Sequence, residues 1–443
     1  MFGCHFGKLF QVTISGGSYQ EALTATIQGV PPGMRITEEE IYGDLLLRKP
    51  GADELSSPRK EPDLPVIVTG LNVDDTVEGA ANKNLSNGTP LTILIPNLDR
   101  HTIHINQYRD TNRTPRPGHA SYASFVKYGP SDDAIGAGFF SGRYTSTIVA
   151  AGCVAKKVLA QCGITVSSYI KEIAGVKCGD IDYATLPDYA ERYKKMRRDL
   201  DPFYQEIYAK NRITMDMRFL TKAAILAEVE KEIDAIRDKA VKISHKEIID
   251  KYGVHPVVLC PDHAAADAMV EECTRIYNEG DTAGGLVELI IQGVPVGLGE
   301  PMFDKLDAQL GRMMGIGAVK GVEIGAGFAV KDMTGYQSND RMQGKDGKVI
   351  FDSNNAGGIT GGLTTGQPII ARLAVKPTPT IDKKQHTIDK YTLETKDLSA
   401  ITRRDPTITN RIWPVAESYA ALIVLDQLIM HYGYQQIRSL IDK

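Results

Sequence analysis

A short sequence pattern occurs twice in this chain of 443 residues, in two distant regions. Residues 27–33 read Ile-Gln-Gly-Val-Pro-Pro-Gly, and residues 291–297 read Ile-Gln-Gly-Val-Pro-Val-Gly. Each copy follows an alternating apolar run typical of a strand and precedes a helical pattern, over 37–47 and 303–310 respectively. A strand, a turn and a helix used twice predict two structurally related halves within one chain.

The region between the two copies differs in composition. Residues 180–280 are poor in glycine and rich in Lys, Glu, Asp and Ala, whereas the flanking regions are punctuated by glycine and proline. Apolar residues from Ile225 to Ile243 recur at helical spacing, and a second helix is predicted over 261–277. We therefore expect a mostly helical insertion at 180–280, with its charges on a solvated face.

Other segments predict parts of the core. The Ala-rich segment 145–162 has apolar residues on one helical face, and the small side chains there would allow close packing. The runs 64–70 and 92–96 are typical of strands that end in turns.

Composition excludes several classes of protein. The chain has 51 Lys and Arg against 55 Asp and Glu, a net charge of −4 and a pI near 6.2, so we expect no nucleic acid or membrane partner. No run of about 18 apolar residues predicts a transmembrane helix, and no secretory signal is visible. The six cysteines have no CxxC spacing, which favours free thiols in a reducing cytoplasm over a zinc site.

The C-terminal region holds glycine-rich segments, at 318–328 and 354–366, followed by Lys-Pro-Thr-Pro-Thr at 376–380. Backbone N–H groups beside a lysine are suited to binding an anion, usually a phosphate. Neither a Walker A motif nor a dinucleotide fingerprint is present in the right context. Turn-rich β structure would explain these glycines equally well, so both interpretations stay open.

Basic residues form a second pattern. Arginine recognises phosphate and carboxylate through two parallel hydrogen bonds, so converging arginines would suit a substrate with several anionic groups. Dispersed surface charge is the alternative. His119 lies in a rigid Arg-Pro-Gly-His turn and is either a fixed catalytic imidazole or a structural one. Asp405 follows two arginines and should be ionised.

Taken together, these segments resemble the chorismate synthase family. The strings that carry the resemblance occur in family order. They are GKLFQVT (7–13), GVPPG (29–33), RKEPD (59–63), NGTP (87–90), RPGHA (116–120), KYG (127–129), GLGEP (297–301), the segments 318–328 and 354–366, KPT (376–378) and RRDP (403–406).

The resemblance implies an α+β fold in which core helices lie between antiparallel sheets, in a single domain over 1–443 that forms a homotetramer. It also implies a lyase of the shikimate pathway, and hence of aromatic amino acid biosynthesis. Such an enzyme uses reduced FMN to eliminate phosphate and a ring hydrogen from 5-enolpyruvylshikimate 3-phosphate in a 1,4 sense.

The resemblance assigns residues as follows. Flavin contacts fall on Ser141, Gly317, Ala318, Gly361, Lys376, Thr378, Thr380 and Arg403. Anionic substrate contacts fall on Arg48, Arg59, Arg116 and Arg143. His119 matches the family's second active-site histidine, and Asp405 matches an aspartate that assists proton removal.

The chain also departs from the family pattern within the expected site. Tyr19 stands where the family has its first active-site histidine, and a phenol with a pKa of about 10 cannot replace an imidazole near neutral pH. Phe139 and Phe140 replace an arginine and a serine, and Glu54 replaces an arginine. These changes leave open two alternatives to the family reaction: a paralogue that acts on another cyclic acid, or a catalytically silent flavin-binding protein.

Overall fold

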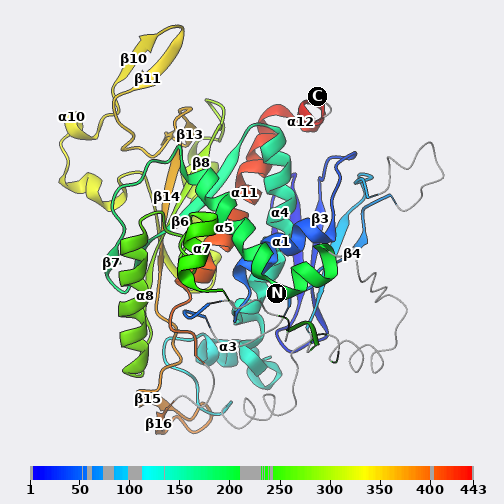
Figure 1. Ribbon diagram of the computed structural model, residues 1–443, viewed down its shortest axis with the longest axis vertical. Helices are drawn as coiled ribbons and strands as arrows, with labels where there is room; N and C mark the ends of the chain where they lie inside the picture. Colours follow the sequence, from blue (N-terminus) through cyan, green and yellow to red (C-terminus); the bar gives the residue numbers. More distant parts are fainter. Residues whose placement is uncertain are drawn as a thin grey trace.

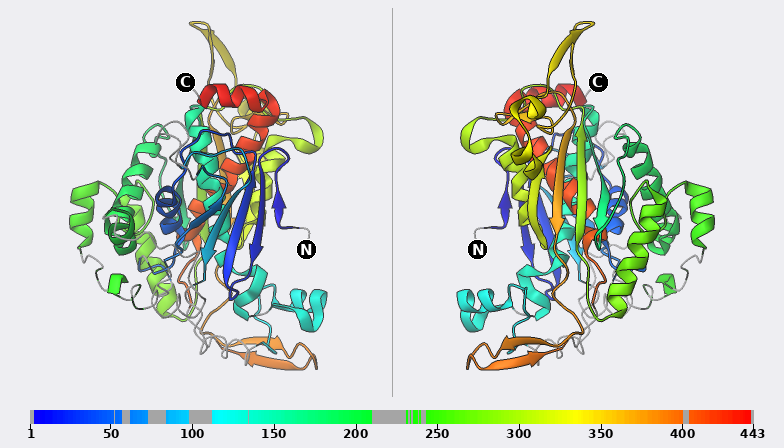
Figure 2. Two further views of the ribbon diagram at one scale, coloured as in Figure 1. Left: turned by 90° about the vertical axis from the view of Figure 1, so that its right-hand side faces the viewer. Right: turned by 90° about the vertical axis from the view of Figure 1, so that its left-hand side faces the viewer.

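The computed structural model describes residues 3–51, 53–56, 62–72, 84–97, 112–133, 135–209, 243–399 and 404–441, with single positions between 231 and 239. Two five-stranded antiparallel sheets enclose a layer of helices (Figure 1, Figure 2). This is the α+β arrangement predicted from the sequence.

Four of the five strands have the same order in both sheets. The first sheet consists of β1 (His5–Phe6), β2 (Gln11–Gly16), β3 (Ala22–Gln28), β5 (Leu91–Pro96) and β4 (Val66–Thr69). The second consists of β7 (Val176–Lys177), β6 (Thr165–Ile173), β8 (Gly285–Gln292), β14 (Ile369–Val375) and β9 (Val319–Ile324). The order β2-β3-β5-β4 in the first sheet corresponds to β6-β8-β14-β9 in the second, and in each the last two strands are reversed relative to the sequence. The two halves therefore share one topology over these four strands.

The repeated heptapeptide occupies equivalent turns at the ends of β3 and β8. Gly29 and Gly293 have φ of 84° and 81°. A Cβ atom would lie 2.3 Å from the carbonyl oxygen of Leu9 at Gly29, and 2.1 Å from that of Gly163 at Gly293. Only glycine fits such a turn, where the backbone is left-handed and another strand begins directly beside it. The sequence echo therefore does mark two related halves.

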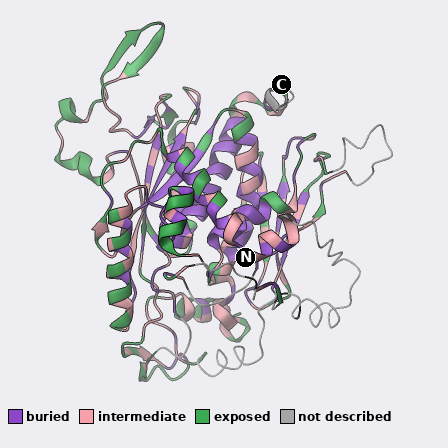
Figure 3. Ribbon diagram, in the orientation of Figure 1, coloured by how far each residue is buried: buried purple, intermediate pink, exposed green. Residues whose placement is uncertain are grey.

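Three helices form the layer between the sheets: α1 (Glu38–Arg48), α4 (Thr145–Gln161) and α11 (Thr409–Tyr432). Gly152 lets α4 approach α11 closely, since a Cβ atom there would lie 2.2 Å from Cβ of Ser418. By length and composition α11 could cross a membrane, but 94% of its apolar window is buried inside the protein. Figure 3 shows it as part of the buried centre of the molecule.

Helix α1 starts where the sequence predicts. Thr37 Oγ1 accepts a hydrogen bond from the Glu40 N–H at 3.2 Å, and the Glu40 carboxylate accepts one from the Thr37 N–H at 3.1 Å. This capping box satisfies two backbone donors that the helix would otherwise leave unpaired. The helix ends at Arg48, and the side chain of this last residue is buried.

The segment between β7 and β8 carries α5 (Leu186–Leu200), α7 (His245–Tyr252) and α8 (His263–Asn278). The last of these matches the helix predicted over 261–277, and Asp262 caps its N-terminus. The long helix predicted from Ile225 to Ile243 lies largely outside the described residues, although Ile233 and Ile236 are buried.

The remaining elements lie at the periphery. They are α3 (Ser121–Tyr128), α9 (Leu306–Gly311), α10 (Gly335–Ser338), α12 (Tyr434–Ile441), and the hairpins β10 (Met342–Lys345) with β11 (Lys348–Phe351), β12 (Ile359–Thr360) with β13 (Leu363–Thr364), and β15 (Gln385–Ile388) with β16 (Thr395–Leu398). The β10–β11 hairpin projects from one end of the molecule, and β15–β16 lies at the opposite end (Figure 1).

Candidate active site

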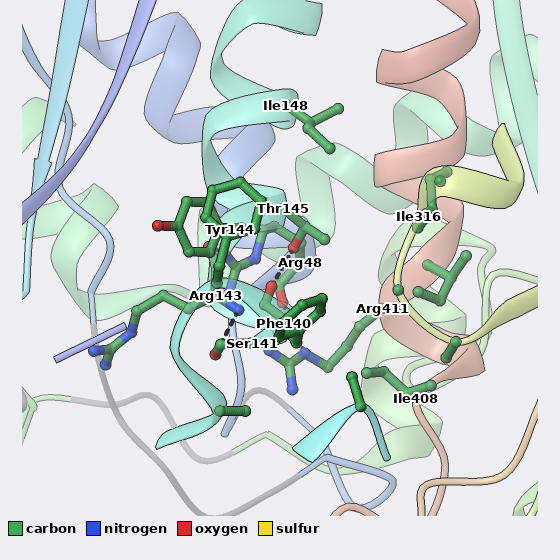
Figure 4. A pocket seen from close by; sticks show the side chains of 18 of the residues that line it. Arg48, Phe140, Ser141, Arg143, Tyr144, Thr145, Ile148, Ile316, Ile408 and Arg411 are labelled. Atoms are coloured by element: carbon green, nitrogen blue, oxygen red, sulfur yellow. Dashed lines mark hydrogen bonds between the residues drawn. The ribbon is translucent and has the colours of Figure 1, made fainter. Parts of the chain in front are cut away.

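A cavity of about 860 Å³ lies where the C-terminus of α1 meets the N-termini of α4 and α11. Its wall includes β1, the 116–120 turn, the loop before β9 and the segment after β14. The volume falls in the upper part of the range of about 300–1,000 Å³ that small-molecule sites occupy. Figure 4 shows side chains from several of these elements around the cavity.

The cavity is strongly cationic. Among the described residues on its wall, the cations are Arg48, Arg116, Arg143, Arg312, Lys376, Arg404 and Arg411, and the one acidic side chain is Asp405. The N-terminal ends of α4 and α11 add the positive ends of two long helices. Such a surplus of positive charge in a partly enclosed space suits a ligand with more than one anionic group.

Arg48 is the most deeply buried of these cations, with 3% of its surface exposed. Its Nη2 lies 3.4 Å from the Asp63 carboxylate, and its Nη1 donates to the Arg143 carbonyl at 3.3 Å. No residue that the structure describes accepts a hydrogen bond from its Nε. Burial, together with the neighbouring Arg411, lowers the pKa of Arg48 despite the attraction of Asp63. A bound anion would supply the acceptor that Nε lacks.

His119 is held in a defined position by its neighbours. The Ser121 backbone N–H donates to Nδ1 at 3.2 Å, and Nε2 lies 3.3 Å from Arg116 Nη2. Burial and the nearby charges of Arg116 and Lys376 lower the pKa of His119 to about 4. Both contacts come from N–H donors, since arginine has no acceptor, so the two ring nitrogens face donors and the neutral ring has one nitrogen that can accept from Arg116 or from Ser121.

Asp405 is bound on both sides. Its carboxylate lies 3.2 Å from Arg411 Nη1, and its backbone carbonyl accepts a hydrogen bond from Thr378 Oγ1 at 3.2 Å. Arg411 in turn donates through Nε to the Arg48 carbonyl at 2.9 Å. These contacts connect the carboxylate to the end of α1 and to the 376–380 segment.

The predicted flavin contacts fall on strained or sharply turned backbone. Ala318 has φ of 72° and Ala137 has φ of 71°, and both residues line the cavity. Left-handed backbone at a residue other than glycine is unfavourable and concentrates at functional sites. Ser141 caps the short helix at 142–144 by accepting from the Arg143 N–H at 3.2 Å.

Of the predicted site residues, the structure places the following on the cavity wall: Arg48, Arg116, His119, Ser141, Arg143, Gly317, Ala318, Lys376, Thr378, Thr380 and Asp405. Arg59 and Arg403 lie outside the described residues.

Three expectations about position need correction. Tyr19 is not on the cavity wall; its ring lies behind it, against Gly136 and 5.9 Å from the Arg143 guanidinium. Gly361 lies in the turn between β12 and β13, away from the cavity, because that hairpin folds back toward Lys305. Glu54 reverses no charge in the site, since its exposed carboxylate lies 3.2 Å from His245 Nε2 on the outer surface.

Sequence reasoning did not find Arg411 or Arg312 as members of the site, whereas Arg404 belonged to the basic pattern that was expected either to converge or to be dispersed over the surface. Arg411 carried one usable signal: it lies in the first turn of a helix, where a cation opposes the helix dipole. Phe139 and Phe140, identified as departures, do line the cavity. The Phe139 ring packs 4.4 Å from that of Tyr144. Burial and the nearby Asp133 raise the pKa of Tyr144 to about 12, so its hydroxyl stays protonated.

The cavity suits a reduced flavin mononucleotide beside an anionic second ligand. One part of the wall is aromatic and aliphatic, and its members are Phe6, Phe139, Phe140, Tyr144, Ile148, Ile316, Ile408 and Tyr419. This surface suits a flat ring system, while the cations suit a phosphate. The unpaired Nε of buried Arg48 agrees with an anion as the missing partner.

The fold and the cavity thus define a class: a two-sheet α+β protein with a deep cavity for anionic ligands. The family profile described as chorismate synthase matches residues 10–429. Chorismate synthases from Acetivibrio thermocellus and Methanosarcina barkeri are 38% and 35% identical, over 100% of this chain and 98% and 100% of theirs. That of Pyrococcus abyssi is 34% identical over 96% of this chain and 97% of its own.

A crystal structure of a chorismate synthase has the same fold, with a TM-score of 0.64 and 21% identity over 99% of this chain and 97% of that one. This chain belongs to the chorismate synthase family.

Proposed function

We propose that this chain is an FMN-dependent lyase that eliminates phosphate from 5-enolpyruvylshikimate 3-phosphate to give chorismate, a step of the shikimate pathway toward aromatic amino acids. The observation that carries the proposal is the cavity itself. Its surplus of arginines, its aromatic wall and its single described carboxylate suit a polyanionic substrate beside a flat cofactor.

Reduced FMN, when bound, would lend electron density to the breaking carbon–oxygen bond and recover it afterwards. The residues that would hold it are Ser141, Gly317, Ala318, Lys376, Thr378 and Thr380 on the cavity wall. Arg403, which lies outside the described residues, is a further predicted contact.

The arginines bind and orient the substrate. Arg48, Arg116 and Arg143 reach the cavity from three different elements, so together they can grip a phosphate and carboxylates from separate sides. The surrounding apolar side chains exclude water, which strengthens each of these charge interactions. A phosphate that leaves as an anion is stabilised by the same cations.

Asp405 and His119 have different parts in moving protons. Asp405 is held by Arg411, which fixes the carboxylate as a hydrogen-bond acceptor for a proton that leaves the substrate or its neighbour. His119 is neutral at pH 7, and its Nε2 lies 3.3 Å from Arg116 Nη2. A bound anion beside it would favour its protonated form and raise its pKa.

The test uses the purified protein under anaerobic conditions, with dithionite-reduced FMN and 5-enolpyruvylshikimate 3-phosphate. We expect release of inorganic phosphate and formation of chorismate, and an Asp405→Asn variant that binds FMN but turns over far more slowly. FMN binding without phosphate release would favour the paralogue that acts on another cyclic acid. Failure to bind reduced FMN would exclude both enzymes.

We further propose that the chain works as a homotetramer without a nucleic acid or membrane partner. The support is a set of exposed apolar side chains in the C-terminal half: Val296, Met302, Phe303, Phe328, Tyr336, Met342 and Val349. Phe303 and Phe328 are 92% and 80% exposed. So much exposed apolar surface is unusual for a monomer and typical of a contact between subunits. We propose in addition that the protein binds reduced FMN and an anionic substrate and that it works in the cytoplasm.

A further inference from the structure

Arg404 connects the cavity to the end of helix α8. It lines the cavity and is 8% exposed. Its Nη2 donates to the Tyr277 carbonyl at 2.7 Å, and its guanidinium carbon lies over the Tyr277 ring at 4.0 Å from the centroid. Its Nη1 forms an ion pair with Asp382. Tyr277 itself does not line the cavity; it belongs to the last turn of α8.

The chain just after α8 joins two cavity segments to each other. Thr282 Oγ1 donates to the Thr378 carbonyl at 2.8 Å, and the Ala283 N–H donates to the Pro406 carbonyl at 2.9 Å. The Asp382 N–H donates to the Gly280 carbonyl at 2.9 Å. Residues 280–283 therefore lie between the 376–382 segment and the 404–407 segment and are bonded to both.

We propose that Arg404 is a positioning residue. By anchoring its segment to the C-terminal end of α8, it holds the adjacent Asp405 carboxylate in its place on the cavity wall. This inference rests on the proposed function and adds to it a role for the helical segment 180–280. Through Tyr277, α8 supports the reaction from outside the cavity.

The geometry favours positioning over charge alone. The planar guanidinium makes a contact with an aromatic ring, a hydrogen bond and an ion pair at once, and the partners of all three are Tyr277 of α8 and Asp382. A lysine could supply the charge but neither the stacking nor the fork of donors. A small displacement of a reacting group lowers turnover far more than it lowers binding.

The first experiment compares kcat and KM for phosphate release in Arg404→Gln, Arg404→Lys and Tyr277→Leu. We expect kcat to fall about 10- to 100-fold in all three with little change in KM. Tyr277→Phe keeps the ring and should retain wild-type kcat. Full activity in Arg404→Lys, or in Tyr277→Leu, would overturn the proposal.

The second experiment is a double-mutant cycle. If Arg404 acts through Asp405, adding Arg404→Gln to Asp405→Asn should lower kcat no further. An equal loss in both backgrounds would instead mean that Arg404 contacts the ligand directly, and the positioning role would be wrong.

A third measurement does not depend on the reaction. Hydrogen exchange at the Ala283 and Asp382 amides should accelerate in Arg404→Gln and Tyr277→Leu, while exchange in β14 stays unchanged. The control Lys383→Gln breaks an exposed ion pair with Asp281 between the same segments and should leave kcat unaltered. Absence of phosphate release by the wild-type protein would refute the proposed function alone, and unchanged exchange would then refute this inference.

Discussion

The buried pair of Arg48 and Asp63 combines two unfavourable features that a chain without a function there would avoid. Both side chains are nearly fully buried, and within the described part of the chain Asp63 Oδ2 and Arg48 Nε have no hydrogen-bond partner. Asp63 also adopts φ of 51°, which is strained for a residue other than glycine. An anion in the cavity would accept the hydrogen bond from Arg48 Nε. We therefore interpret the strained backbone at Asp63 as part of a site that is preorganised for an anionic ligand.

Replacing Asp63 by Asn should destabilise the protein markedly. The substitution leaves the buried Arg48 cation without its counter-ion, which lowers the free energy of unfolding by about 3–5 kcal/mol. Urea denaturation of the two proteins measures the difference. As a control, Lys8→Met removes an exposed pair with Asp304 and should change stability by less than about 1 kcal/mol. A similar small effect for both variants would contradict the argument.

His119 makes stability depend on pH in a defined direction. Its pKa is about 4 in the folded protein and about 6.5 in an unfolded chain. Between these values the unfolded state binds more protons, so the free energy of unfolding falls as the pH decreases from about 6.5 to about 4, by up to about 3 kcal/mol. His119→Gln should remove that part of the dependence in urea melts at pH 7, 5.5 and 4.5. Parallel curves for the two proteins would refute it.

At the scale of elements, the contact between α4 and α11 is set by a glycine. Gly152 leaves room for Ser418, whereas a Cβ atom at Gly43 in α1 would fit without a clash, since its nearest neighbour would be Arg198 Cδ at an ordinary contact distance of 3.6 Å. The close contact with α11 therefore requires glycine at position 152, whereas nothing in the packing requires glycine at position 43. This distinction depends on the partner helix and is invisible in either local sequence.

The two glycines give a matched pair of variants. Gly152→Ala forces the helices apart and should lower the free energy of unfolding by about 1–3 kcal/mol. Gly43→Ala lowers the conformational entropy of the unfolded state without a clash in the folded state. It should raise the free energy of unfolding by about 0.5–1 kcal/mol. Thermal and urea unfolding decide the signs. A stabilising Gly152→Ala would mean that α4 and α11 are less closely packed than described.

Sequence patterns predicted the elements better than the positions of single side chains. The repeated heptapeptide identified two halves because Gly29 and Gly293 are each required by local backbone geometry. Glu54 was misplaced because it follows Arg48 by only a few residues, yet the chain turns outward after α1 and directs it to His245. Arg411 reaches Asp405 and Arg48 only through tertiary packing, so no local spacing could have indicated it.

At the scale of the whole molecule, exposed apolar residues are distributed unevenly. The C-terminal half carries Phe303 and Phe328 on its surface, and the β10–β11 hairpin extends beyond the body of the protein (Figure 2). The outer face of the first sheet is instead lined by hydroxyl pairs, such as Ser15 with Thr24 at 2.6 Å. The two outer faces therefore differ in the contacts they can make.

Subunit assembly should depend on the apolar surface. The double variant Phe303→Glu, Phe328→Glu places two charges where we propose a subunit contact, so its mass by light scattering should fall below that of the wild-type protein, for which we propose a tetramer. Circular dichroism verifies that the fold is kept. The control is Leu393→Glu. Leu393 is also exposed, at 62%, but it lies just before β16 and outside the proposed contact, so this variant should keep the wild-type mass. An unaltered mass in the double variant would place the contact elsewhere.

Helix α11 also determines when the chain can finish folding. Its Asp426 carboxylate accepts hydrogen bonds from the backbone N–H groups of Lys8, Leu9 and Phe10, more than 400 residues earlier in the sequence. During synthesis, the first sheet and α4, which packs on it, emerge from the ribosome long before α11, which packs against α4 and binds the segment just before β2. The early half of the protein must therefore persist with an open apolar face until the late half arrives, and in the cell this interval is when the chain has most need of a chaperone.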